Sequence, residues 1–466
     1  MTEQEQSGQV GGGIFLDTRY SMSKNVAGGV SDMELRSIVE SPHIASIHKQ
    51  LLETFEKRSQ PGHGFETDLG VINSAYDTEL RETVKQTLED ISDAGITVTD
   101  VVLAGIGGSE LGATAVISAC GTTDVNYHPI TSLNNDNISR ILGSIDPKGT
   151  VLIEVSRSGT TKETLTAYKV VQEYLKDKLA DDKDDNYMAH CVAVLGKDKL
   201  DAAKQAAGNN KIGIEGAMSG RYTGLHAANL FTMAIMGVDI DEVHAGARSM
   251  LEGCMSAESL DDNPALHVAA LKYLMNTQHA KSVWNTGVFS PSLVKYGDWL
   301  DQLTEESLGH NENVRLSTKT TELSNKLHSD FQNWWAGANM FYHQFVFPLD
   351  SNTASLDNPL VKGETLGDIE LAAYIGTVEA LAANGRPSFT TFMPKIDAYN
   401  MGQLMMRDML STIYLGELYG LSDEPGIQGK GYFNQPGVQA YKDIMKGLLS
   451  NPGQLRARYK DIKDMQ

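Results

Sequence analysis

Residues 100–112 read DVVLAGIGGSELG, and residues 150–164 read TVLIEVSRSGTTKET. In each stretch a short apolar run leads directly into a loop rich in glycine or hydroxyl residues, and helical apolar spacing follows. The pattern predicts two β-loop-α units. Further strand candidates at Ala189–Leu195, Ser282–Asn285 and Pro387–Pro394 alternate with helical stretches. We therefore expect an α/β fold whose parallel sheets are covered by helices on both faces.

The chain has 466 residues, a length typical of two or three domains at roughly 150 residues each. We expect a flexible acidic and glycine-rich arm over residues 1–30 and a first α/β domain with N-terminal helices over residues 31–245. A second α/β domain is expected over residues 246–425, and a C-terminal loop and helix over residues 426–466. Among the helices, the apolar spacing predicts Thr223–Met236, Gln403–Gly420 and Val438–Leu449.

The formal net charge is −21, from 60 acidic and 39 basic residues. Long-range repulsion opposes binding to nucleic acid or to an anionic membrane, so an anionic ligand has to meet a local basic site. No stretch of eighteen apolar residues predicts a membrane span, and the first thirty residues lack the pattern of a signal peptide. Three cysteines without paired spacing are expected to be reduced, which favours a cytoplasmic location.

The first loop has glycines at positions 105, 107, 108 and 112 and feeds a helix N-terminus. Glycines let the backbone approach a ligand closely, and the N–H groups of a helix N-terminus favour an anion. Glu110 stands where a dinucleotide fingerprint has its third glycine, and the chain has no GxxxxGK[ST] sequence. A tight turn that binds no ligand is the alternative for this loop taken alone.

The second loop concentrates hydroxyl groups at a strand-to-helix junction. Such a cluster can donate several hydrogen bonds to a tetrahedral oxyanion. Helix capping is the alternative, but it uses one hydroxyl group and leaves the others unexplained. The five hydroxyl residues are Ser156, Ser158, Thr160, Thr161 and Thr164, with Arg157 and Lys162 between them.

The segments GIGGSELG and SRSGTTKET resemble the paired signatures of the sugar isomerase fold, and specifically of the glucose-6-phosphate isomerase family in its compact bacterial form. Four further segments match in order: SGRYTGLHA, WLDQLTEESLG, NKLHSDFQ and YFNQPGVQAYK. The resemblance covers nearly the whole chain. It implies two doubly wound, flavodoxin-like sugar isomerase domains wrapped by N- and C-terminal helices.

The resemblance also implies site residues. Glu306 matches the catalytic base, Arg221 the arginine beside the reacting carbons, and His328 and Lys442 the pair that opens the sugar ring. The other matched positions are implied to bind substrate, with those before residue 165 forming the anion site: Gly108, Ser109, Ser156, Arg157, Ser158, Thr161, Thr164, Gly220, Gln302 and Gln435.

These residue types suit the implied chemistry. Moving a carbonyl between C1 and C2 of a sugar requires one base that removes a proton and returns it to the neighbouring carbon, as Glu306 can. A fixed guanidinium such as Arg221 stabilises the enediolate, and a histidine with a lysine can open the ring. Taken alone, Glu306 also fits a solvated helix face, and His328 and Lys442 fit ordinary surface positions.

Further expectations follow from the resemblance. The enzyme is expected to use no cofactor, and the twelve histidines include no HExxH pair or cysteine-histidine cluster that predicts a metal site. The implied partner is a small anionic sugar. The family is dimeric, so we expect a homodimer in which His328 serves Glu306 of the other subunit.

Several positions depart from the family pattern: Arg157, Leu308, His310, Asn434 and the pair Trp334–Trp335. They leave three hypotheses open. The chain is an isomerase of glucose 6-phosphate, or an isomerase of another C6-anionic hexose such as sulfoquinovose, or a sugar-phosphate sensor without catalysis. A sensor needs only the anion loop, so Glu306, Arg221, His328 and Lys442 argue against it.

Overall fold

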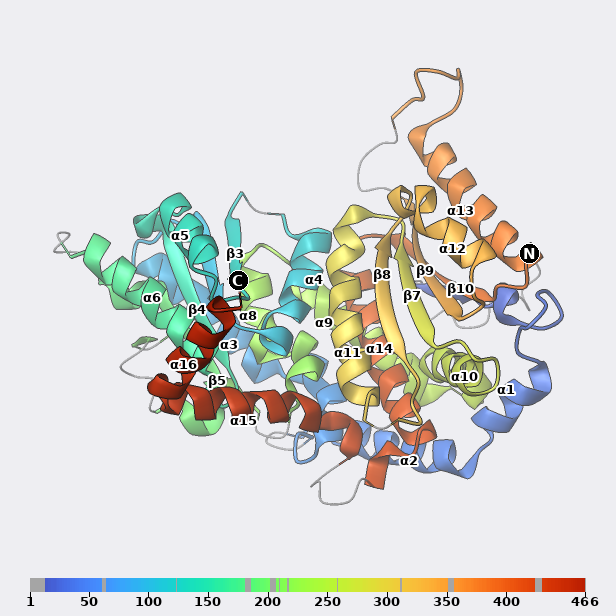
Figure 1. Cartoon of the computed structure of the whole chain (residues 1–466), viewed down its shortest axis with the longest axis horizontal. Helices are drawn as coiled ribbons and strands as arrows, with labels where there is room; N and C mark the ends of the chain where they lie inside the picture. Colours follow the sequence, from blue (N-terminus) through green and yellow to red (C-terminus); the bar gives the residue numbers. More distant parts are fainter. Residues whose placement is uncertain are drawn as a thin grey trace.

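The structure is a computed structural model, and the residues that it describes are 13–60, 64–122, 124–180, 186–201, 207–208, 210–215, 218–257, 259–310, 312–350, 356–423 and 430–465. They form two five-stranded sheets surrounded by helices. Figure 1 shows the first sheet on the left and the second on the right, with helices between them.

The first sheet is parallel throughout and has the order β3-β2-β4-β5-β6. Its strands are β2 (Asp100–Ala104), β3 (Asn126–Ile130), β4 (Thr150–Ser156), β5 (Cys191–Gly196) and β6 (Lys211–Ile214). Every residue of β2, β4 and β5 is buried. Continuous burial explains why these strands read as apolar runs, because helices cover both faces of the sheet.

Alternate side chains of the first sheet enter two different cores. Val101 and Ile153 belong to the large core, which they share with α3 and α8, whereas Val102 and Leu152 pack with α5 and α6 on the opposite face. The helices of this half are α3 (Thr78–Asp93), α4 (Leu111–Cys120), α5 (Asn135–Ser144), α6 (Lys162–Lys178) and α8 (Ala227–Ile235). The expectation of a parallel sheet covered on both faces is confirmed.

The second sheet has the order β1-β10-β9-β7-β8 and is parallel except for its edge strand β1. Its strands are β1 (Phe15–Asp17), β7 (Val283–Val288), β8 (Ser317–Glu322), β9 (Phe341–Asp350) and β10 (Ser388–Lys395). Helices α12 (Asp330–Ala336) and α13 (Leu366–Ala383) lie on one side of it. Strands β8 and β9 have no counterpart among the strands that the sequence predicts.

Helices α9 (Ile240–Ser256), α10 (Pro264–Thr277), α11 (Val294–Leu308) and α14 (Ala398–Leu418) lie between the sheets or beneath the second one (Figure 1). Helix α14 is buried along almost its whole length. The predicted helix over residues 223–236 is divided: a 3-10 segment, Gly220–Leu225, precedes α8, and His226 between them is extended.

The N-terminal helices α1 (Asp32–Val39) and α2 (Pro42–Glu56) and the 3-10 segment Asp68–Tyr76 line the outer side of the central helices. At the other end, α15 (Pro436–Ser450) runs below the first sheet in the view of Figure 1, and α16 (Pro452–Lys463) turns back across the front of that sheet. N- and C-terminal helices thus wrap the two sheets, as the resemblance implies. None of the described helices is both long and apolar enough to cross a membrane.

The expectation of a flexible arm over residues 1–30 is wrong for its second half. Residues 1–12 lie outside the described residues, but residues 13–30 include β1, which pairs with β10. Ile14, Leu16, Met22 and Val30 are buried in the large core. Their burial fixes this part of the chain on the second sheet, whereas the glycine-rich composition of the segment predicts an arm.

The topology of the first sheet places a ligand site. In chain order its strands are arranged 2-1-3-4-5, so the direction of chain progress reverses between β2 and β4. Ligands of open parallel sheets bind outside the carboxyl ends of the strands at such a point. The glycine loop follows β2 and the hydroxyl loop follows β4, so both predicted anion-binding loops meet there.

Candidate active site

A cleft of about 850 Å³ opens at the carboxyl ends of β2 and β4. Its other walls come from α11, from the 3-10 segment around Arg221 and from the start of α15. It brings together all predicted site residues except His328. Those that line it are Gly108, Ser109, Ser156, Arg157, Ser158, Thr161, Thr164, Gly220, Arg221, Gln302, Glu306, Gln435 and Lys442.

Two positions of the first loop must be glycine, because neighbouring atoms leave no room for a Cβ atom. A Cβ atom on Gly108 would lie 2.2 Å from the carbonyl carbon of Gly220, so only glycine lets the two loops touch. Gly107 has φ +63, and a Cβ atom there would lie 2.8 Å from Nε2 of Gln302. The glycine pattern therefore holds the loop against the Arg221 segment and α11, and brings their backbones to the cleft.

The hydroxyl loop folds back on itself at the start of α6. Ser156 Oγ accepts a hydrogen bond from the Gly159 N–H at 3.2 Å, and Ser158 Oγ accepts one from the Thr160 N–H at 3.2 Å. Thr161 is the N-cap residue of α6, but its side chain does not cap the helix. The capping alternative for this residue is therefore wrong, and its hydroxyl group lines the cleft.

The predicted base and arginine lie side by side in the cleft. Arg221 Nη1 donates to Glu306 Oε2 at 3.2 Å, and Gln302 Nε2 donates to Glu306 Oε1 at 2.9 Å. Gln302 and Glu306 are four residues apart on α11, so one helix face presents both. The Glu306 side chain keeps 25% of its surface exposed. The carboxylate is thus held by both oxygens and still open to a ligand.

Arg221 is 1% exposed and directs all of its donor groups at partners within the protein. Its Nε donates to Ser307 Oγ at 2.7 Å, and its Nη2 donates to the carbonyl groups of Tyr432 and Asn434 at 2.6 and 3.0 Å. Its Nη1 also donates to Gln435 Oε1 at 2.9 Å. The guanidinium therefore fixes the C-terminal segment against α11.

That segment leads directly into α15, whose first turn follows Gln435 and which carries Lys442. No residue of α15 is buried, although its side chains contribute to the wall of the cleft. The position of Lys442 thus depends on the anchoring of the preceding residues by Arg221.

Burial and nearby charges shift the pKa values of charged groups in the cleft in opposite directions. Burial lowers the pKa of Arg221, while the nearby Tyr222 and Glu306 oppose that shift. Burial raises the pKa of Asp68, and the positive charges of Arg157 and Arg221 offset part of the rise. In a chain of net charge −21, these arginines supply the local positive charge that an anionic ligand needs.

His328 lies outside the cleft of its own chain. It ends the 3-10 segment Asn325–His328, which follows β8 at the far sheet, and it is exposed. The described residues that line the cleft do not include it. One chain therefore brings together the predicted base, arginine, lysine and anion loop, but not the predicted histidine.

Several lining residues escaped sequence reasoning: Asp68, Ser219, Phe433 and Tyr441. Ser219 and Tyr441 each stand beside a matched residue, and that adjacency is a signal that could have found them. Asp68 stands in no motif. It reaches the cleft because the 3-10 segment that it begins packs against the Arg221 segment.

The positions that depart from the family pattern are not all in the site. Arg157 and Asn434 line the cleft, and Arg157 Nη1 donates to the Met218 carbonyl group. Leu308 is fully buried in the large core, and Trp334 is buried in the aromatic cluster of the second sheet. The described lining does not include His310. Of the departures, Arg157 and Asn434 are among the described residues that line the cleft of one chain, and Trp335 is exposed outside it.

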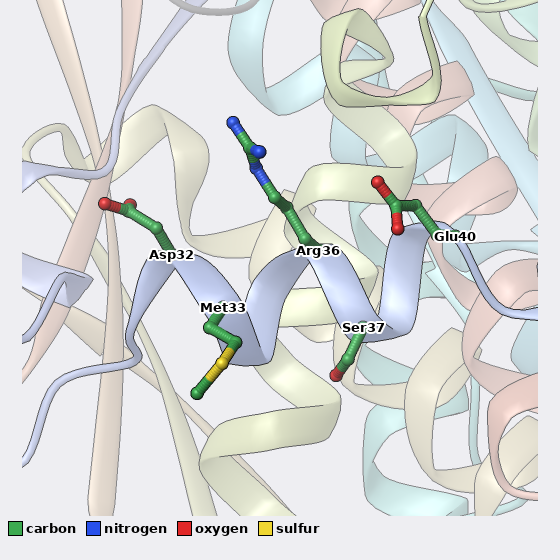
Figure 2. A pocket seen from close by; sticks show the side chains of 5 residues that line it. All are labelled: Asp32, Met33, Arg36, Ser37 and Glu40. Carbon is green, nitrogen blue, oxygen red and sulfur yellow. The ribbon is translucent and has the colours of Figure 1, made fainter.

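A second hollow, of about 490 Å³, lies along α1 (Figure 2). Its lining side chains come from this helix and from the C-cap residue Glu40: Asp32, Met33, Arg36, Ser37 and Glu40. In Figure 2 Met33 and Ser37 point to the side of the helix opposite to Arg36, so the set does not converge on a common point. Among the described residues, no group of three or more His, Cys, Asp or Glu side chains could hold a metal ion.

The sequence model of the family described as Phosphoglucose isomerase matches residues 73–423. A glucose-6-phosphate isomerase of Thermus thermophilus is 29% identical over 418 residues, which cover 85% of this chain and 96% of that enzyme. The glucose-6-phosphate isomerase of Symbiobacterium thermophilum is 26% identical over 472 residues, covering 96% of this chain and 98% of that one.

Solved structures have a similar fold. A hypothetical protein of Thermus thermophilus superimposes with a TM-score of 0.77 at 27% identity, covering 94% of this chain and all of the other. The glucose-6-phosphate isomerase of Chlamydia trachomatis gives a TM-score of 0.79 at 17% identity, covering 99% of this chain and 94% of that one, a likeness of fold. The chain belongs to the phosphoglucose isomerase family.

Proposed function

We propose that the chain interconverts glucose 6-phosphate and fructose 6-phosphate by proton transfer through a cis-enediol. One observation carries the proposal. The Glu306 carboxylate, held by Arg221 and Gln302, shares a single cleft with the hydroxyl loop at the start of α6. At one end of the cleft, a base beside a guanidinium suits C1 and C2 of a C6-anionic sugar. At the other end, the anion site suits the charged group on C6.

The reacting end is at Glu306. Its carboxylate takes the proton from C2 of the open-chain aldose and returns it to C1. The O2 hydroxyl group loses its proton and O1 gains one, which completes the exchange. Negative charge develops on the enediolate oxygens beside the base. The Arg221 guanidinium is fixed by six partners among the described residues before substrate arrives, so it stabilises that charge without reorganising.

The anion end is at the hydroxyl loop. The N-terminus of α6 has N–H groups that the Thr161 side chain does not cap, and the positive end of the helix dipole faces the same place. The hydroxyl groups of Ser158 and Thr161 and the guanidinium of Arg157 line the cleft beside it. The C6 anion binds here, which places C1 and C2 toward Glu306.

Ring opening requires an acid and a base at the ring oxygen and the C1 hydroxyl group. Lys442 lies in the cleft and serves as one of them. His328, exposed and outside the cleft of its own chain, serves the site of a second subunit in a homodimer. The site is then complete only in the dimer.

The second candidate is the isomerisation of sulfoquinovose, favoured by Arg157, which departs from the family pattern and lines the cleft. A sulfonate carries one negative charge, whereas a phosphate monoester carries about −1.5 to −2 at neutral pH. The sensor hypothesis is not favoured, because binding alone does not require a carboxylate fixed against an arginine.

The test is a side-by-side measurement of kcat/KM on glucose 6-phosphate and on sulfoquinovose. We expect glucose 6-phosphate to be preferred by more than about a hundredfold, equivalent to about 2.7 kcal/mol of transition-state stabilisation. The reverse preference would assign the sulfonate sugar. Absence of turnover on both, with either sugar still bound, would support the sensor.

A further inference from the structure

Asp68 brings a third carboxylate into the cleft, besides Glu306 and Glu163. It is the first residue of the 3-10 segment Asp68–Tyr76, whose following residues are buried. Its backbone position is therefore fixed by the core on one side while its side chain faces the cleft. The proposed proton transfer does not use this carboxylate.

The carboxylate of Asp68 has no hydrogen bond or ion pair with any of the residues that the structure describes. It differs in this from the nearby acid Glu306, both of whose oxygens accept hydrogen bonds. Burial raises the pKa of Asp68 although two arginines oppose the rise. A half-buried carboxylate facing a polar cleft has acceptor capacity that a ligand can use.

The position of Asp68 along the cleft identifies which part of the ligand it meets. The 3-10 segment that it begins packs against the segment that carries Arg221, and Arg157 of the anion loop donates to the carbonyl group of Met218, just before that segment. The anion loop holds C6 and the base acts on C1 and C2, on the proposed function. A residue that faces the cleft between these two ends meets the middle carbons of the sugar.

We infer that Asp68 is a specificity-determining residue that accepts hydrogen bonds from the C3 or C4 hydroxyl group of the bound sugar. The inference rests on the proposed function for the direction of the sugar in the cleft. Two neighbouring hydroxyl groups can donate to the two oxygens of one carboxylate, and such charge-assisted hydrogen bonds are the stronger class. Asp68 would then select hexoses by the configuration of their middle carbons.

The competing role for Asp68 is electrostatic. A carboxylate near Arg157 and Arg221 offsets their charge, and its removal would then change the affinity for every C6-anionic ligand by the same factor. Direct recognition of a hydroxyl group predicts a change that depends on whether the ligand has that group. The two roles are separated by comparing ligands, not by comparing variants alone.

The test measures dissociation constants by calorimetry for glucitol 6-phosphate and its 3-deoxy and 4-deoxy forms. These alcohols have no carbonyl group and cannot react, so binding is read independently of turnover. In the unmodified protein, loss of the recognised hydroxyl group is expected to weaken binding at least about tenfold. In Asp68→Ala the same loss should weaken binding less than about threefold. Asp68→Asn, which keeps one acceptor oxygen, should lie between them.

Glu163→Gln is the matched control, because it removes one negative charge from the same cleft. It should keep the tenfold difference between the parent alcohol and the deoxy form. If Asp68→Ala and Asp68→Asn also keep that difference, or if the unmodified protein binds all three alcohols equally, the inference is overturned. Failure of the proposed function shows separately, as binding of glucitol 6-phosphate without isomerisation of glucose 6-phosphate.

Discussion

Four strands of each sheet share an order, β3-β2-β4-β5 in the first and β8-β7-β9-β10 in the second, but the two sheets use their carboxyl edges differently. In the first sheet the point where chain progress reverses lies between β2 and β4, and in the second it lies between β7 and β9. The first edge carries the glycine and hydroxyl loops and is open to the cleft. At the second edge, the ring of Phe289, just after β7, packs against the rings of Phe347 and Tyr374. The ring centroids are 5.2 and 5.5 Å apart.

Each sheet thus has a strand-order reversal of the kind at which parallel sheets bind ligands, and the side chains at each carboxyl edge decide which of the two is open. The second sheet contributes to the candidate site through the helix that follows its strand β7. Helix α11, after β7, carries Glu306 into the cleft of the first sheet, whereas the segment after β8 leaves His328 exposed elsewhere.

The largest effect is expected at Glu306. Glu306→Gln keeps the shape of the side chain but cannot act as a base, so kcat should fall by about 10²–10⁴-fold with KM within about threefold. Steady-state kinetics on glucose 6-phosphate measure both. The matched control is Glu305→Gln, because Glu305 accepts hydrogen bonds from Thr318 on β8 instead of facing the cleft. A Glu306→Gln enzyme with more than about a tenth of the activity would remove Glu306 from this role.

Phe289 should matter for stability instead of for chemistry. Phe289→Ala leaves a cavity in the aromatic cluster and should lower the free energy of unfolding by about 3–5 kcal/mol, measured by denaturant titration. The enzyme that remains folded should keep its KM, because the described lining of the cleft does not include Phe289. A large rise in KM with unchanged stability would show that the second edge takes part in ligand binding.

The hydroxyl loop should decide the affinity for the C6 anion. Replacing Ser158 and Thr161 together by alanine should raise KM by about 10–100-fold with little change in kcat, because hydrogen bonds to the anion are lost in ground state and transition state alike. Thr166→Ala is the control, since its hydroxyl group bonds to the Lys162 carbonyl on the exposed face of α6. An unchanged KM in the double variant would place the anion elsewhere.

A smaller effect is expected at Asp301, where α11 meets the second sheet. Thr320 donates to its Oδ2, but Oδ1 is buried without a partner among the described residues, and burial raises the pKa of the carboxyl to about 6. Because this folded-state pKa lies above the unfolded value, the protonated form favours folding, and stability is lost as the pH rises toward and past 6. Asp301→Asn should therefore stabilise the protein by about 1–2 kcal/mol at pH 8 and hardly at all near pH 4.

Thermal unfolding at both pH values measures this difference. Asp298→Asn, at a more exposed position of the same helix, should change stability by less than about 0.5 kcal/mol at either pH. An Asp301→Asn variant that is equally stabilised at pH 4 and pH 8 would contradict the titration account.

The sequence predicts the first sheet better than the second for a physical reason. Strands β2, β4 and β5 are buried on both faces and are apolar runs, so the pattern shows them directly. In the second sheet, buried polar side chains satisfy one another across strands. Thr321 Oγ1 donates to Asn285 Oδ1, and Gln344 Nε2 donates to Thr286 Oγ1, both at 3.1 Å. The sequences of β8 and β9 therefore lack the signal of a buried strand.

The site residues also divide into those that a sequence pattern predicts and those that it does not. Residues in motifs that follow strands, such as Ser156 and Gly108, could be predicted because strand ends of a parallel sheet meet at one edge. Glu306, Gln435 and Lys442 came only from the family resemblance, since their spacing fits a surface helix equally well. Asp68 could not be predicted, because only the packing of a 3-10 segment brings it to the cleft.

On the proposed function, the cleft of one chain is completed by His328 of a second chain. Mixing Glu306→Gln chains with His328→Ala chains tests it most directly, because each variant alone is expected to be inactive. After the two are unfolded and refolded together, about half of the dimers should be mixed, and half of the sites in those dimers should be intact. Activity should return to about a quarter of that of the unmodified enzyme. If size measurements confirm mixed dimers and no activity returns, both residues act within one chain and the shared site is wrong.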